Sequence, residues 1–205
     1  MSLIKPRIYL ASRSPRRREL LHQIGVNFDL MLFRTPPRED AEVNEDMLDN
    51  ETSDDYVVRV ARAKAAFGAR MIAQRRLPSR LLLAADTTLD VDGRIVAKPR
   101  DAGHATEILS RLSGRTHRVL TAVALTHGER IEHAVSVSEV RFRDLQTEEI
   151  RRYVASGDPL DKAGAYGIQG HAAMFVAEIR GSHSGIVGLP LCETALLLRQ
   201  FGYPI

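Results

Sequence analysis

Three observations predict that this chain is an α/β protein, with residues 1–205 forming one domain. Apolar runs at 8–11 and 81–85 have the length of buried strands and lie beside helical patterns. Residues 116–126 and 131–142 are typical of two long strands joined by a short turn into an antiparallel pair. The third observation is length, because 205 residues can bury a substantial core.

A strand, a turn and a helix follow one another near the N-terminus. Ser14 stands where a helix N-cap belongs, Pro15 occupies the first helical position, and Gly25 ends the helix. The arginines 16–18 crowd the first turn, where the helix dipole is already positive. Free N–H groups and guanidinium side chains at such a turn favour binding of a multiply charged anion. Three solvated arginines are the alternative.

An acidic segment follows a second expected strand at 27–33. Residues 34–53 are rich in proline and acids and show no period, which predicts a loop. A loop this long in a compact domain is often functional. We expect most of its acids to be solvated and one to serve a site; among them are Glu39, Asp40, Glu42, Glu45 and Asp46.

The next helix is expected to begin at Ser53-Asp54-Asp55, with acids at its positive end. Val57, Val60, Phe67 and Met71 form its apolar stripe, which Lys64 interrupts. One interpretation is a lysine whose stem packs while its head reaches water. The other is an ammonium held at the edge of a cleft as a phosphate contact.

Asp86 follows the apolar run 81–85 directly, so the pattern places a carboxylate at the end of a buried strand. A desolvated carboxylate needs a cation or hydrogen-bond donors nearby, and ligands of open α/β sheets sit at the carboxyl ends of strands. Asp86 is therefore the strongest single candidate for a metal ligand or a base. Asp92-Gly93 predicts a hairpin between 89–91 and 94–97, after which Lys98 returns towards Asp86.

The remaining elements are expected from periodicity and turn residues. Residues 161–170 hold three glycines, which let the backbone approach a ligand closely. The other expected elements are a helix capped by Asp101 and running to Leu112, a helix through 147–154, a strand at 175–179, a turn at 181–185 and a last helix around 196–198.

Composition excludes several classes of protein. A hydrophobic content of 44% and a charged content of 27% are ordinary for a soluble globular chain, and a net charge of +3 is too weak to indicate nucleic-acid binding. The single Cys192 excludes an intramolecular disulfide or a cysteine-cluster zinc site. No apolar run could span a bilayer and no secretory segment is recognisable, so we expect a cytoplasmic protein.

Phosphate chemistry is the function that the residues favour. Walker, dinucleotide-binding, zinc-protease and nucleophile-elbow motifs are absent from the sequence. What remains is a basic strand–helix turn, two lysines, Asp86 and an acidic loop. Cationic side chains suit phosphates, while carboxylates bind Mg²⁺ or Mn²⁺ and can activate water. The residues alone thus indicate metal-dependent chemistry on a phosphate ester or anhydride.

Over nearly its whole length the chain resembles the Maf family of nucleoside triphosphate pyrophosphatases. Residues 161–170 are the most specific match, and the others are 11–17, 85–87, 98–99, 112–114 and 187–190. The resemblance implies a Maf/ITPase-like α/β fold, an elongated mixed sheet with flanking helices in two lobes around a nucleotide-binding cleft. It implies release of a monophosphate and pyrophosphate, and some members are tied to septum formation in cell division.

By resemblance, Asp86 matches the family's proposed proton acceptor, and Glu45 is matched to its acidic-loop glutamate. These two would hold a divalent cation, Mg²⁺ or Mn²⁺, with Lys64 and Lys98 completing the catalytic set. The residues that match substrate-binding positions are Ser12, Arg16, Arg17, Thr87 and Gln169. The chain departs from the family pattern at Arg13, where a small residue is usual, and at His183, where Tyr is frequent.

The decapeptide that includes Gln169 looks like the branch acting on dTTP and UTP. The expected activity is therefore metal-dependent hydrolysis of these nucleotides. Two rivals stay open: the same chemistry on a modified nucleotide such as 7-methyl-GTP, and a nucleotide-sensing regulator of cell division. A small-molecule nucleotide is the expected partner, without a stable nucleic-acid or membrane partner; a homodimer is left open.

Overall fold

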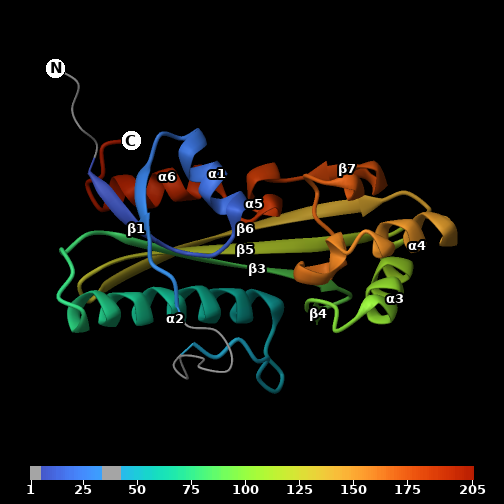
Figure 1. The fold of residues 1–205 in the computed structure, drawn as a ribbon, viewed down its shortest axis with the longest axis horizontal. Helices are drawn as coiled ribbons and strands as arrows, with labels where there is room; N and C mark the ends of the chain where they lie inside the picture. Colours follow the sequence, from blue (N-terminus) through green and yellow to red (C-terminus); the bar gives the residue numbers. More distant parts are fainter. Residues whose placement is uncertain (1–5, 34–42) are drawn as a thin grey trace.

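The computed structural model describes residues 6–33 and 43–205. Its centre is one elongated seven-stranded sheet in the order β2-β1-β3-β5-β6-β7, with β4 paired to β3 (Figure 1). The pairs β1–β2 and β1–β3 are parallel and the others are antiparallel, so the sheet is mixed as expected. The strands are β1 (Arg7–Ala11), β2 (Asn27–Leu30), β3 (Leu82–Val91), β4 (Arg94–Val96), β5 (Thr116–His127), β6 (Arg130–Phe142) and β7 (Val176–Arg180).

Helices cover both faces of this sheet. α2 lies along one face, and α1, α5 and α6 lie along the other (Figure 1). None of the helices in the described ranges has the length and apolar composition needed to span a bilayer. The helices are α1 (Pro15–Gln23), α2 (Ser53–Gln74), α3 (Ala102–Leu112), α4 (Thr147–Ala155), α5 (His183–Val187) and α6 (Leu191–Gln200), with 3₁₀ turns η1 (Asp158–Asp161), η2 (Ala163–Ala165) and η3 (His171–Phe175).

Buried apolar residues form three clusters that divide the sheet into two lobes. Near β1, α1 and α6 pack on one face through residues such as Leu21 and Leu198, while α2 packs on the other through Val57 and Ala61. At the far end, α3, α4 and the 3₁₀ turns surround Phe142. The fold class expected from the sequence is therefore confirmed.

Three local predictions need correction, and a fourth lies outside the described residues. The strand expected at 27–33 ends at Leu30, and the N–H of Met31 makes a last bond to the carbonyl of Leu10. α2 is capped by the Thr52 hydroxyl rather than from Ser53 onwards. The expected turn at 181–185 is the start of α5, because the Ser182 hydroxyl accepts from the N–H of Gly185 and caps a short helix. The acids Glu39, Asp40 and Glu42 lie outside the described residues.

The most consequential correction concerns β3, which was expected to end before Asp86. It runs on to Val91, because β5 pairs with it continuously from Leu82 to Asp90. The opposite edge of β3 is paired only at its ends, with β1 at 82–84 and with β4 at 89–91. Residues 85–88 therefore face a gap between β1 and β4 in which no described strand pairs with them. Asp86 lies in the middle of a strand, beside this gap.

The glycine-rich segment closes against β3 just beyond the gap. The N–H of Gly164 donates to the carbonyl of Ala97, and φ at Gly164 is +70°. A Cβ built at this position would lie 2.5 Å from Leu89 Cδ1. A glycine is thus required here both for the left-handed backbone and for the close approach.

The far lobe contains a buried histidine whose titration should affect stability. His117 is 2% exposed, and its Nε2 lies 2.7 Å from the Tyr166 hydroxyl. Burial lowers the pKa of His117 to about 4. The unfolded chain, with a histidine pKa of about 6.5, binds the proton more readily, so acid favours unfolding.

We expect the free energy of unfolding to fall as the pH drops from about 6.5 towards 4, by up to about 3 kcal/mol from this residue. Urea unfolding at several pH values would measure the slope. In the variant His117→Gln the free energy of unfolding should depend less on pH over the same range. An unchanged slope in that variant would show that other groups govern acid stability.

Candidate functional site

The α2 face of the gap carries a cluster of opposite charges. Lys64 Nζ lies 2.8 Å from Asp86 Oδ1 and 2.7 Å from Glu45 Oε1. The side chains of Lys64 and Asp86 are only 14% and 11% exposed, whereas that of Glu45 is 52% exposed. Lys64 thus does not reach into open solvent; its ammonium joins a strand carboxylate to a loop carboxylate.

Glu45 remains a carboxylate in this cluster although it has lost part of its hydration. Burial raises the pKa of Glu45, but the ammonium of Lys64, by charge and hydrogen bond, and then Lys98 and Arg17 outweigh burial and hold the pKa below its usual value. Lys98 and Arg17 therefore act on Glu45 through their charge, whereas Lys64 contacts it directly.

The opposite face of the gap is organised by Arg17 in the first turn of α1. Its Nε donates to the carbonyl of Gly188 at 2.7 Å, Nη2 donates to the Thr87 hydroxyl at 3.1 Å, and Nη1 lies 3.5 Å from the Ser12 hydroxyl. Ser14 caps α1 as predicted, accepting from the N–H of Arg17. The helix begins where β1 ends, so its N-terminus lies beside the gap.

A second row of bonds fixes the Thr87 hydroxyl. It lies 3.0 Å from the hydroxyl of Thr121, which donates to the carbonyl of Gly185 at 2.8 Å. Gly188, with φ of +124°, comes so close that a Cβ there would lie 3.5 Å from Thr87 Oγ1. The segment from α5 to Gly188 therefore contacts Arg17 directly and holds Thr87 through Thr121.

These two groups of residues meet through the gap. Successive side chains of a strand point to opposite faces, which puts Asp86 on the α2 side and Thr87 on the α1 side. Burial lowers the pKa of the Arg17 guanidinium, the charge of Asp86 opposes that change, Arg16 adds to it, and Glu45 opposes it. Arg17 thus interacts electrostatically with both carboxylates from the other side of the sheet.

The structure places the predicted site residues unequally. Ser12, Arg17, Lys64, Asp86, Thr87 and Glu45 make the direct contacts described above. Arg16 and Lys98 act on the cluster through charge alone. Gln169 is exposed in the glycine-rich segment and makes no hydrogen bond to any described residue. Its neighbour Ile168 packs against the clusters of both lobes.

The donor set suits a hard divalent cation. Asp86 and Glu45 offer carboxylate oxygens that reach one common point, which the ammonium of Lys64 marks. Mg²⁺ and Mn²⁺ prefer oxygen ligands, and Mg²⁺ is commonly held by one or two carboxylates together with substrate phosphates. No group of three or more acidic, histidine or cysteine side chains within the described ranges could hold a metal. Asp86 and Glu45 therefore fit a cation that is also bound by a substrate phosphate.

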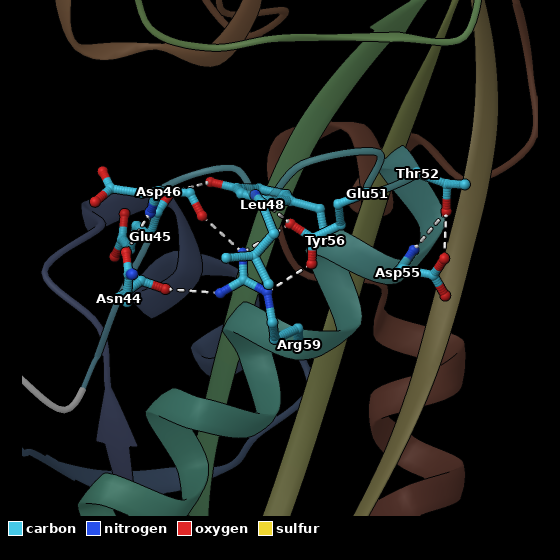
Figure 2. A network of polar contacts seen from close by, with 9 residues as sticks. All are labelled: Asn44, Glu45, Asp46, Leu48, Glu51, Thr52, Asp55, Tyr56 and Arg59. Atoms are coloured by element: carbon cyan, nitrogen blue, oxygen red, sulfur yellow. Dashed lines mark hydrogen bonds and ion pairs between the residues drawn. The ribbon is translucent and has the colours of Figure 1, made fainter.

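Two residues at this site were missed by the sequence analysis. The Tyr56 hydroxyl donates to the carbonyl of Glu45 at 2.9 Å, and Arg59 donates to the carbonyls of Asn44 and Asp46 at 3.0 and 2.8 Å (Figure 2). Their spacing of three residues places them on one face of α2, directly after the acidic loop. That spacing was the available signal, but it does not reveal which backbone the side chains reach.

Comparison with known proteins shows the family of the chain. A model of the Maf-like protein family matches residues 7–201. The chain is 59% identical over 206 residues to dTTP/UTP pyrophosphatase of Aromatoleum aromaticum, with 100% of both chains covered. It is 55% identical to the Dechloromonas aromatica protein of that name, covering 96% of this chain and 98% of the relative. For the Ralstonia nicotianae protein of that name, identity is 56%, with 95% and 94% covered. The chain therefore belongs to the Maf-like protein family.

Proposed function

We propose that this protein hydrolyses dTTP and UTP to the nucleoside monophosphate and pyrophosphate. The observation that carries the proposal is the convergence of Arg17, Lys64, Glu45 and Asp86 at the gap beside β3. Cations and carboxylates on the two sides of one gap suit a metal–triphosphate substrate. The names of the relatives, which the chain matches along nearly its full length, support the choice of nucleotides.

Each group has a defined task in this proposal. Arg17, Arg16 and Lys98 bind the anionic phosphates, and their charge stabilises the leaving pyrophosphate. Asp86 takes a proton from the attacking water. The water oxygen bonds to the α-phosphorus as the α–β anhydride bond breaks and pyrophosphate leaves. Glu45 and Asp86 would hold Mg²⁺ or Mn²⁺, which when bound would neutralise phosphate charge. Lys64 keeps the two carboxylates together.

A nucleotide panel assayed for monophosphate and pyrophosphate tests the function. dTTP and UTP should be cleaved faster than purine triphosphates with Mg²⁺ or Mn²⁺, and EDTA should abolish turnover. Release of inorganic phosphate instead of pyrophosphate would contradict the reaction. A preference for 7-methyl-GTP would contradict the substrate, and binding without turnover would indicate a nucleotide sensor.

Gln169 is our candidate for the residue that recognises the pyrimidine base by hydrogen bonds. A uracil or thymine edge offers two carbonyl acceptors and one N–H donor, and one amide can donate and accept at once. The exposed amide of Gln169 has no partner among the described residues and is free to do so. Gln169→Ala should lower kcat/KM for dTTP and UTP about 10-fold while changing that for purine triphosphates little. Equal slowing of every nucleotide in the panel would contradict this role.

A further inference from the structure

The loop that carries Glu45 depends on side chains of α2 for its conformation. Residues 43–52 contain no helix or strand. The carbonyls of three successive residues, Asn44, Glu45 and Asp46, each accept a hydrogen bond from Arg59 or Tyr56 (Figure 2). The loop backbone is thus fixed at the residue whose carboxylate enters the site.

Arg59 is in turn held by an acid further along the same loop. Its Nε and Nη2 donate to the two carboxylate oxygens of Glu51 at 2.5 and 2.8 Å. Glu51 also accepts from the N–H of Leu48 at 3.2 Å. This two-pronged ion pair orients the guanidinium so that its remaining N–H groups point at the loop carbonyls. One planar group therefore fastens both ends of the segment from Asn44 to Glu51.

The same helix supplies the partner of the Glu45 carboxylate. Arg59 and Lys64 both project from α2, the first to the loop backbone and the second to the Glu45 side chain. Because α2 is a continuous helix, the distance between these two anchor points is fixed. The position of the Glu45 carboxylate relative to Asp86 then follows from α2 rather than from the loop itself.

We infer that Arg59, backed by Glu51 and Tyr56, is a positioning residue that presents Glu45 to the catalytic cluster. This inference rests on the proposed function of Glu45. The side chain of Glu45 is 52% exposed, so burial alone does not fix it. Loss of the guanidinium would release the carbonyls of Asn44 and Asp46 on either side of Glu45, and the carboxylate would spend most of its time away from Asp86.

Arg59→Ala is expected to raise the Mg²⁺ concentration needed for half-maximal turnover about 10-fold to 100-fold, the range found for residues that orient metal ligands. Arg59→Lys should be nearly as poor, since an ammonium keeps the charge but cannot serve two carboxylate oxygens and two carbonyls together. Arg62→Ala is the matched control, because Arg62 lies on the same helix but contacts Ile131 and His133 instead. It should behave like the wild type.

Loop position can be measured without turnover. The chain has no tryptophan, so Met47→Trp introduces a single fluorophore in the loop at a side chain that is 55% exposed. In this background Arg59→Ala should lower the anisotropy of the tryptophan fluorescence, and Arg62→Ala should not. Unchanged anisotropy after Arg59→Ala would overturn the inference, and so would wild-type metal dependence in Arg59→Lys.

A double-mutant cycle separates this inference from the proposed function. If Arg59 acts through Glu45, adding Arg59→Ala to Glu45→Gln should change kcat less than twofold. Independent, additive losses would show that Arg59 acts by another route and would overturn the inference alone. Full activity of Glu45→Gln would instead remove the proposed role of Glu45 and with it the purpose of the positioning.

Discussion

Replacing Asp86 by asparagine is expected to lower kcat at least ~10²-fold, the scale of one general acid–base contribution, while the melting temperature stays near that of the wild type. The amide keeps the shape of the side chain, and its carbonyl oxygen can still accept from Lys64 Nζ. What it loses is the negative charge that a base or a cation ligand requires. Steady-state kinetics and a melting curve on the purified variant measure the two quantities.

Asp90 provides the matched control for this substitution. It lies four residues further along β3 on the same face, is 5% exposed, and accepts from the Ser53 hydroxyl and the N–H of Gly93. Asp90→Asn should cost about 1–2 kcal/mol of stability through these bonds and leave kcat near the wild-type value. An Asp86→Asn variant that is folded and fully active would contradict the catalytic assignment.

Arg17→Ala is expected to damage both stability and catalysis. The substitution leaves the buried carbonyl of Gly188 and the Thr87 hydroxyl without their charged donor, at a cost of about 2–4 kcal/mol. It also removes a cation from the phosphate site, which should reduce kcat/KM ~10²-fold to 10³-fold. Arg17→Lys should recover part of the catalytic loss but little of the stability, since one ammonium cannot reach three acceptors.

Arg18 is the control for charge on α1. It is the next residue, is half-buried as well, and its side chain makes no hydrogen bond to any described residue. Arg18→Ala should therefore leave the melting temperature near that of the wild type and keep kcat/KM within a factor of about two. Equal losses in the Arg17 and Arg18 variants would mean that general positive charge, rather than the bonds of Arg17, governs the site.

Local chemistry in the sequence was sufficient for most elements of the fold. The cap at Ser14 and the hairpin at Asp92-Gly93 lie where their residues predict them, because both depend on a few neighbouring positions. The end of β3 was predicted wrongly, because a polar Asp86-Thr87-Thr88 sequence normally closes a buried strand. Its continuation depends on β5, which lies more than thirty residues away in the chain.

The candidate site likewise contains some residues that the local sequence indicates and others that only tertiary structure brings to it. A lysine on an apolar stripe and arginines at a helix N-terminus are unfavourable in local structure. This is why Lys64 and the arginines could be predicted as site residues from the sequence. Glu45 is one of seven acids in residues 34–53 and was singled out only by family resemblance. Arg59 carried only its helical spacing from Tyr56 as a signal, because a salt bridge to a loop acid and bonds to loop carbonyls are set by tertiary structure. The roles assigned to these residues stay predictions.

The gap beside β3 also determines what its main chain can do. The carbonyl of Leu81 accepts from the N–H of Tyr9 on the β1 side, and alternate residues of a strand direct their backbone groups to the same edge. The amides of Ala85 and Thr87 therefore point into the gap, where no described strand takes them. β3 thus brings two main-chain donors, as well as two side chains, to the position where the charged residues meet. No side-chain replacement other than proline can remove these donors, so their presence at this edge does not depend on which other residues occupy the two positions.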